Sequence, residues 1–349
     1  MLLLIVGIWW LLLVAEITGG DAIPACEMLL VAAVTYVLAR ALTRRHASLV
    51  PMVVVAAAIL FAYFRQRVLF IRGPDAPLGY SNATGSLYML AAAAALMVVA
   101  RARTRDMRIA SACAAVAFAA VPLLNTTATA TVLVAVVPLA LLATSEQGVR
   151  VAVATSAAAF VLTLAVALSL GLSYRPIQRG GRPSPVVDAT LSERRLMLWS
   201  DALRMISNHP LTGVGPDRFP ETSPTALRDP DTPWPHDEVL HFGAEAGLPG
   251  AAFLLLFFGW GFARLWWSEG DRGTAVAAAA LGAVAVHSNV DYVLHYPAVV
   301  IAAAALVGAG SVRGAVAHRD THHPGARTRR GTSGASRARD PVVGREPRT

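Results

Sequence analysis

Apolar blocks of alanine, valine and leucine alternate along most of the chain with short polar loops that carry arginine. The hydrocarbon core of a bilayer is about 30 Å thick, so a helix that crosses it needs about 20 predominantly apolar residues. The pattern therefore predicts an all-α fold, a polytopic transmembrane bundle of about ten helices. The expected spans are residues 2–18, 23–42, 50–64, 86–100, 109–124, 130–144, 151–172, 248–267, 274–289 and 296–312.

One polar stretch of roughly 75 residues interrupts this pattern between the seventh and the eighth expected spans. It divides the chain into a first group of seven transmembrane helices (residues 1–172), a large loop (173–247) and a second group of three (248–312). Residues 313–349 are rich in Arg, Gly, Ser and Pro and hold few large apolar side chains, which predicts a disordered tail. Because charged and aromatic residues gather in the 173–247 loop, we expect the chemistry there or where this loop meets the bilayer.

The arginine-bearing loops decide the expected orientation. Loops around residues 40–46, 101–108, 146–150 and 264–272 all fall on one side of the predicted bundle. Short loops that carry an excess of positive charge stay on the cytoplasmic side of a membrane. We therefore expect a multi-pass protein of the cytoplasmic (inner) membrane with both termini inside and the 173–247 loop outside.

Three arginines oppose this rule. Arg65, Arg67 and Arg72 lie in a loop that the pattern places outside the membrane. An outward cluster of positive charge works against insertion. Two interpretations stay open: a solvated loop, or a site that binds an anion.

Composition agrees with a membrane protein, because 55% of the 349 residues are hydrophobic and 15% are charged. All 30 basic residues are arginine, which together with the abundant alanine indicates codon bias. The net charge of +8 therefore does not predict nucleic-acid binding, and the basic loops and tail are expected to lie against membrane lipids. Cys26 and Cys113 both lie in apolar segments and predict no disulfide framework.

No metal site and no cofactor are predicted. His236 and His241 lie about 140° apart around a helix, so the two cannot chelate one ion as an i, i+4 pair would. His318, His322 and His323 in the tail are at most an adventitious chelating group. The sequence lacks His-Glu-x-x-His, Gly-x-Ser-x-Gly and the P-loop pattern, which argues against a metalloprotease, a serine hydrolase and an NTPase.

The large loop begins its ordered part with an amphipathic helix, expected at about 191–207. Thr190 and Glu193 form a capping-box pattern, and apolar residues then follow at helical spacing, among them Leu196 and Trp199. Pro210 ends the helix, because proline disfavours helical geometry in the residue before it. Residues 212–215 read Thr-Gly-Val-Gly and predict a tight turn, and residues 216–234 predict a loop.

A second short helix is expected from His236 to about residue 246. At helical spacing His236, Leu240, Gly243 and Gly247 share one face, so small residues leave room beside the imidazole. Imidazole is a suitable general base because it titrates near neutral pH. The alternative interpretation is that His236 only caps the helix.

Four motifs occur in order over about residues 75–310. They read Gly79-Tyr80-Ser81-Asn82, then Arg195 and Trp199 followed by Pro210-Leu211-Thr212-Gly213-Val214-Gly215, then His236-Asp237 with Gly247-x-x-Gly250 nine residues on, and finally His287-x-x-x-Asp291. Together they resemble the signatures of the O-antigen ligase/polymerase family of bacterial polytopic membrane proteins. Two positions depart from that family. Asp237 stands where the ligases have Asn, Ser or Gln, and no arginine follows Asn125 where the family often has one.

The resemblance implies transfer of a glycan from a polyprenyl-pyrophosphate carrier to an acceptor hydroxyl on a glycan, lipid or protein. In such a reaction arginine stabilises the pyrophosphate leaving group without a metal, and a histidine removes the proton from the acceptor. The expected catalytic residues are His236, with Asp237 or Glu245 to orient it. The expected substrate-binding residues are Arg194, Arg195, Arg65, Arg67, Arg72, Trp199 and Asn82.

Alternatives remain at the level of the sequence. Trp199 also fits a core position of the loop helix, and Arg195 fits a solvated helix face. For the whole chain, the alternatives are a transporter or flippase for a polar solute or a lipid-linked sugar, and a non-catalytic scaffold for polysaccharide assembly.

Overall fold

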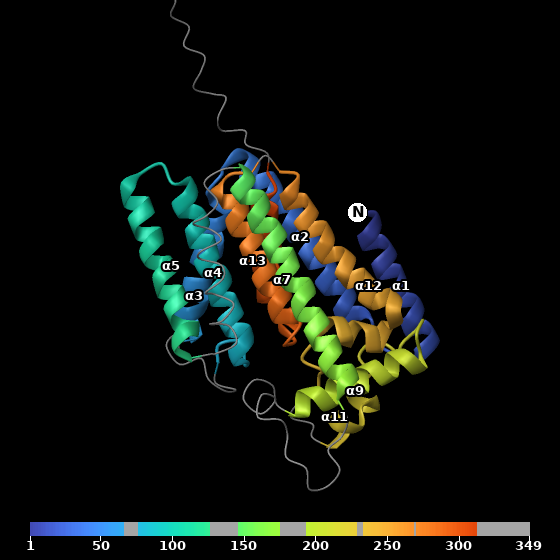
Figure 1. The fold of residues 1–349 in the computed structure, drawn as a ribbon. Coiled ribbons are helices and arrows are strands. Elements are labelled where there is room, and N and C mark those ends of the chain that lie inside the picture. The colour runs from blue at the N-terminus through green and yellow to red at the C-terminus, as the bar shows by residue number, and fades with distance from the viewer. Residues whose placement is uncertain (66–75, 126–145, 175–192, 229–232, 269, 313–349) are drawn as a thin grey trace, which may run out of the picture. The chain divides into compact units, whose positions relative to one another are not determined.

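The computed structural model describes residues 1–65, 76–125, 146–174, 193–228, 233–268 and 270–312. Within these ranges the protein is helical and contains no strand (Figure 1). The long helices are α1 (Leu2–Thr18), α2 (Ile23–Arg45), α3 (Leu49–Arg65), α4 (Ser81–Arg101), α5 (Arg105–Asn125), α7 (Glu146–Ser173), α9 (Glu193–Asn208), α12 (Glu238–Trp266), α13 (Arg272–Ser288) and α14 (Pro297–Gly310). The short helices are α10 (Phe219–Thr222), α11 (Pro224–Arg228) and the 3-10 turn η2 (Val293–His295).

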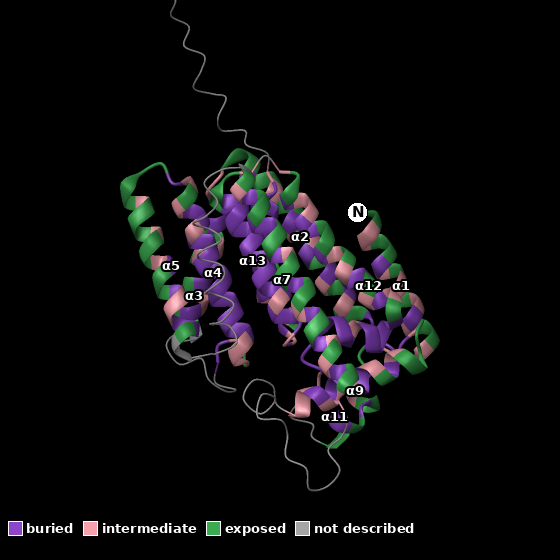
Figure 2. Ribbon diagram, viewed as in Figure 1, coloured by how far each residue is buried: buried purple, intermediate pink, exposed green. Residues whose placement is uncertain are grey.

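Helices α4 and α13 form the centre of the bundle. Helix α13 packs against α4, α7, α12 and α14, while α4 also packs against α3 and α5. Both helices are rich in alanine and are buried along most of their length (Figure 2). Small side chains allow close approach of helix backbones, which is how helices associate where no water is present to drive them together.

The outer helices expose large apolar side chains. Trp9 of α1, Val37 of α2, Val116 of α5 and Leu162 of α7 are all exposed. Helices α2, α4, α5, α7 and α12 are long and apolar enough to cross a membrane, and α1, α3 and α14 are shorter apolar helices. An apolar exterior of this kind fits lipid rather than water as the surrounding solvent.

Helices α9, α10 and α11 lie at one end of the long helices (Figure 1). Their core holds Trp199, Phe219 and Leu240. The carboxylate of Asp201 ties α11 to α9, because it accepts hydrogen bonds from Ser223 Oγ (2.6 Å) and the backbone N–H of Thr225 (3.0 Å). The loop thus has a small core of its own, joined to the bundle through the first half of α12.

A break at Gly247 separates the two halves of α12. Its backbone has φ 73° and ψ −174°, a conformation that is open essentially only to glycine. The turn before it docks here: Val214 N–H donates to the carbonyl of Ala244 (2.8 Å) and Leu248 N–H donates to that of Pro210 (2.8 Å). The predicted short helix after His236 and the predicted span from 248 are therefore two halves of one kinked element.

Most predicted helices in the described ranges have counterparts in the structure. Helix α4 starts at Ser81 rather than at 86, so the Asn82 motif lies inside its first turn. Residues 216–234 were expected to form a loop, and the structure instead folds part of them into α10 and α11. The expected span 130–144, the capping Thr190, the loop arginines Arg67 and Arg72 and the tail 313–349 lie outside the described residues.

Candidate active site

His236 is fixed immediately before α12. Its backbone has φ 56°, a left-handed conformation that a side chain other than glycine rarely adopts. The next residue, Asp237, is the N-cap of α12 and accepts a hydrogen bond from the backbone N–H of Leu240 (2.9 Å). The imidazole is buried, and strained backbone of this kind often occurs at functional sites.

The partner of His236 is Asp291, in the segment between α13 and η2. Asp291 Oδ1 lies 3.0 Å from His236 Nδ1, and both side chains are buried. A carboxylate at Nδ1 fixes the tautomer that carries hydrogen there and leaves Nε2 free to accept a proton. Aspartate and histidine are therefore arranged as an orienting group and a base.

Asp291 is held ionised by the donors around it. The Tyr80 hydroxyl reaches both carboxylate oxygens (2.9 and 2.8 Å), and Asn82 Nδ2 lies 2.5 Å from Oδ2. Burial alone would raise the pKa of Asp291, but the hydrogen bond from His236 and the positive potential of the nearby His236, His287 and Arg195 hold that pKa well below its usual range. The site therefore contains a permanent negative charge beside the imidazole.

Aromatic rings enclose this pair. Tyr80 and Tyr292 stack with ring centroids 4.8 Å apart, and the His236 ring lies 4.8 Å from Tyr292 in an edge-on arrangement. Burial and the charge of Asp291 raise the pKa of Tyr80, so its hydroxyl stays a donor. Behind them, His287 Nδ1 lies 2.8 Å from Ser86 Oγ, which links α13 to α4. Four elements distant in sequence thus meet at one carboxylate.

Of the two adjacent loop arginines, Arg195 is the one that reaches this site. Its Nη2 lies 4.0 Å from Asp291 Oδ2, and its side chain is 23% exposed. Arg194 lines a separate hollow with Thr225 and Arg228. Arg195 is therefore partly open to a ligand while still held next to the histidine–aspartate pair.

The other predicted site residues lie elsewhere. Glu245 accepts hydrogen bonds from the backbone N–H groups of Asp217 (2.9 Å) and Phe219 (3.1 Å), and so fastens the turn before α10. Trp199 is 1% exposed and lies in the core of the loop. Arg65 is the last residue of α3. By position, Asp291 rather than Asp237 or Glu245 is the carboxylate that contacts His236 Nδ1.

Asp237 lies in an environment that favours the uncharged form of its side chain. It is fully buried, and burial raises the pKa of Asp237 to about 8. At neutral pH the side chain is therefore mostly uncharged. A neutral carboxylic acid at an N-cap accepts the same hydrogen bond as an asparagine would.

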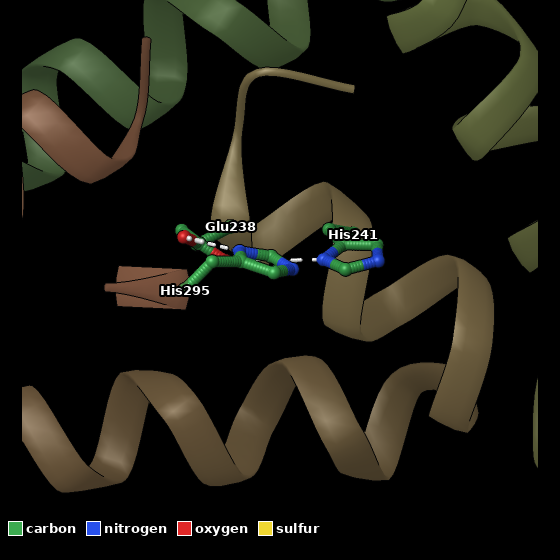
Figure 3. Close-up of side chains that lie close together, drawn as sticks. All are labelled: Glu238, His241 and His295. Carbon is green, nitrogen blue, oxygen red and sulfur yellow. Dashed lines mark hydrogen bonds and ion pairs between the residues drawn. The ribbon is translucent and has the colours of Figure 1, made fainter. Parts of the chain in front are cut away.

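Two residues of this site were not among the predicted site residues. Asp291 was noted as the end of the His287-x-x-x-Asp291 pattern, and Tyr80 as the neighbour of Asn82. Their distance along the chain from His236 hid the contact. A different histidine–carboxylate group, formed by Glu238, His241 and His295, lies beside the first turn of α12 (Figure 3). Among the described residues, these three side chains form the group whose ligand atoms lie close enough together to hold a metal ion.

The comparison with known protein families decides the class. The sequence model of the O-antigen ligase family matches residues 112–255, a segment that contains Arg195 and His236. Residues 112–255, less than half of the chain, are thus similar to the O-antigen ligase family, and this match supports membership in that family. No curated protein and no solved structure matches this chain.

The match and the apolar helices together support a broad role. They indicate a multi-pass inner-membrane protein with the role of a glycan ligase or polymerase, and the family implies a lipid-linked glycan donor and a glycan acceptor. Tyr80, Asn82 and Asp291 lie outside the matched segment. Their place in the site rests on the geometry alone.

Proposed function

We propose that this O-antigen ligase family member transfers a glycan from a polyprenyl-pyrophosphate carrier to an acceptor hydroxyl, with His236 as the general base. The observation that carries the proposal is the buried His236–Asp291 pair with Arg195 beside it. A base, a group that orients it and a cation for a leaving phosphate are the three parts that such a transfer requires.

In the proposed step, His236 Nε2 takes the proton from the acceptor hydroxyl as its oxygen attacks the anomeric carbon of the donor. The bond from that carbon to the pyrophosphate oxygen breaks, and its electron pair stays on the leaving group. Asp291 stabilises the imidazolium that forms, since its carboxylate accepts the hydrogen bond from Nδ1 (3.0 Å).

Arg195 is proposed to stabilise the departing pyrophosphate. A guanidinium group binds phosphate oxygens by two parallel charge-assisted hydrogen bonds. Its contact with Asp291 is long, 4.0 Å, so the group can turn to a ligand without breaking a short ion pair. This supply of charge lets the transfer proceed without a metal ion. A contribution from Arg194, Arg65, Arg67 or Arg72 to carrier binding stays a prediction.

The proposed topology has about ten spans, cytoplasmic termini and the 173–247 loop outside. Support comes from the arginines at helix ends. Arg101, at the end of α4, bonds to Asp271 (Nε to Oδ2, 2.9 Å) and to the carbonyl of Ala309, so these ends of α4, α13 and α14 gather together. The His236 site lies at the opposite ends of α4 and α13, which the positive-inside rule places outside the cytoplasm.

The test is the lipid-linked glycan content of a deletion strain complemented with wild type, His236→Ala or His209→Ala. His209 is an exposed histidine of the same loop and serves as the matched control. We expect His236→Ala to accumulate carrier-bound glycan and lose surface glycan at unchanged protein level, while His209→Ala behaves as wild type.

The kind of glycan that accumulates separates the two activities. Single repeat units on the final acceptor identify a polymerase, and full-length chains stranded on the carrier identify a ligase. Normal surface glycan with His236→Ala would overturn the catalytic role of this histidine and favour a transporter or a scaffold.

A further inference from the structure

Three potential metal ligands converge beside the first turn of α12. One oxygen of Glu238 and one nitrogen each of His241 and His295 lie within 4.8 Å of one another (Figure 3). The two imidazole rings are stacked with centroids 5.0 Å apart. Ligand atoms around a tetrahedral zinc ion, with bonds of about 2.0–2.2 Å, stand about 3.3 Å apart. To bind one ion, the three atoms would have to approach one another from separations of up to 4.8 Å to about 3.3 Å.

Several buried polar atoms of the cluster make no hydrogen bond. Glu238 Oε1 accepts from the backbone N–H of Leu294 (3.0 Å) and lies 3.2 Å from His295 Nδ1, but Glu238 Oε2 is buried without a hydrogen-bond partner. Both ring nitrogens of the buried His241 also lack a hydrogen bond, although Nδ1 lies 3.8 Å from Glu238 Oε2 and Nε2 lies 3.1 Å from Glu245 Oε1 in ion-pair contacts. Buried polar atoms without partners cost free energy, and a cation would satisfy them.

The charge around the cluster favours a cation. All three residues line a cavity of about 260 Å³, to which Asp21, Asp217 and Glu245 also contribute. The described lining of this cavity contains no arginine. The cavity lining holds four carboxylates, those of Asp21, Asp217, Glu245 and Glu238. If all four are ionised, the cavity keeps a net negative charge even when His241 and His295 each carry a proton. The nearby His236 site differs, because it has Arg195.

We propose that Glu238, His241 and His295 bind one divalent transition-metal ion, of the zinc type, that braces the active site. Two imidazoles and a carboxylate are a ligand set suited to zinc or cobalt, and the cavity has room for water as a further ligand. Glu238 and His241 belong to α12 and His295 to η2. The ion would therefore cross-link the segment that follows His236 to the segment that follows Asp291, and it takes no part in the transfer step.

Cobalt binding to the purified full chain tests this site. The protein is isolated through an affinity tag without histidine, treated with a chelator and titrated with Co²⁺. His318, His322 and His323 are replaced by alanine throughout, so that the tail cannot contribute. We expect one Co²⁺ per chain with a visible absorption band of low coordination number, and quenching of Trp234, whose ring lies 5.0 Å from that of His241. Trp234→Phe identifies this part of the fluorescence.

Single substitutions complete the test. We expect His295→Gln and His241→Gln each to weaken Co²⁺ binding at least about 100-fold, since each removes one of three protein ligands. His209→Gln should bind as wild type. The side chain of His295 is 31% exposed, so His295→Gln is the variant that retains the fold if replacement of buried His241 does not.

Two results would overturn the proposal. The first is the absence of saturable one-to-one binding in the protein with an intact cluster. The second is unchanged affinity in His295→Gln. In either case the cluster is a buried ionic network without a metal. Because the readout is metal binding rather than transfer, its failure leaves the proposed glycan transfer untouched.

Discussion

Two histidine–carboxylate groups flank the start of α12, and they differ in what surrounds them. His236 pairs with Asp291 among hydroxyl and amide donors, with Arg195 4.0 Å from the carboxylate. Glu238, His241 and His295 instead lie on a cavity whose other charged lining residues are acidic. Both groups combine imidazole with a carboxylate.

The difference lies in which charge is in excess. Hydrogen-bond donors and a guanidinium group offset the negative charge of the ionised Asp291, which agrees with the proposed binding of an anionic pyrophosphate at the first group. The second group keeps surplus negative charge and unbonded nitrogen and oxygen atoms, so it favours a cation. Neighbouring groups thus give the two histidine–carboxylate groups different charge environments, and the two proposed functions rest on that difference. Four substitutions can break or sharpen this contrast.

The largest effect on transfer is expected from Asp291→Asn. An amide cannot stabilise the imidazolium as a carboxylate does, and loss of general-base function costs about 10²–10⁴-fold in rate. We expect a fall in kcat of about 100-fold or more with glycan transfer as the measurement. Asp271→Asn is the control, because that N-cap carboxylate bonds to Arg101 at the other end of the bundle. Equal rates in Asp291→Asn and wild type would contradict the paired role.

Gly247→Ala tests the break in α12, the helix at whose start both groups lie. A Cβ at Gly247 would collide with the carbonyl of Leu211, and φ 73° is unfavourable for alanine. We expect a loss of about 2–4 kcal/mol in the free energy of unfolding. Thermal unfolding in detergent measures it. Gly259→Ala, in the same helix with open space around it, should be neutral or slightly stabilising. Similar unfolding temperatures for the two variants would argue against a rigid break at Gly247.

Arg195→Lys should have a smaller effect on transfer. Lysine keeps the charge but loses the two parallel hydrogen bonds, so we expect a fall of about 10-fold in kcat/KM. Arg194→Lys should fall less, because Arg194 lines a different hollow. Arg204→Lys, on the same helix and paired with Asp201, is the control. A larger loss from Arg194→Lys than from Arg195→Lys would reverse the assignment of the leaving-group residue.

Asp237→Asn should change transfer least, within about twofold, because asparagine keeps the N-cap. Its effect is on the pH dependence of stability. Burial raises the pKa of Asp237 to about 8, so the folded chain holds a proton that the unfolded chain releases near pH 4. The stability that this proton contributes is complete below about pH 4 and is lost as pH rises towards 8, by at most about 1.4 kcal/mol per pH unit.

The variant lacks this titration. We therefore expect Asp237→Asn to gain unfolding temperature relative to wild type between pH 5 and pH 8, and the difference to level off above about pH 8. Parallel curves for the two proteins over this range would show that Asp237 is ionised in the folded state.

Much of the fold was determined by the sequence alone. Apolar blocks of spanning length, the stripe through Trp199 and the glycine at 247 are local patterns, and local hydrophobicity and backbone freedom control where helices form and break. The motif around His236 likewise indicated the family that residues 112–255 match, and it predicts His236 as the base. These features depend on residues that are near one another in the chain.

Tertiary structure alone decided which carboxylate each histidine meets. Asp291 lies 55 positions beyond His236, while Asp237 and Glu245 are close in sequence but are used as a helix cap and as an acceptor for the turn. His295 likewise contacts Glu238, 57 positions away in the chain, only because the helices pack together. Contacts between the ends of separate helices depend on how the helices pack, and no local pattern encodes that distance. The neighbours that give each histidine its charge environment are therefore set by packing.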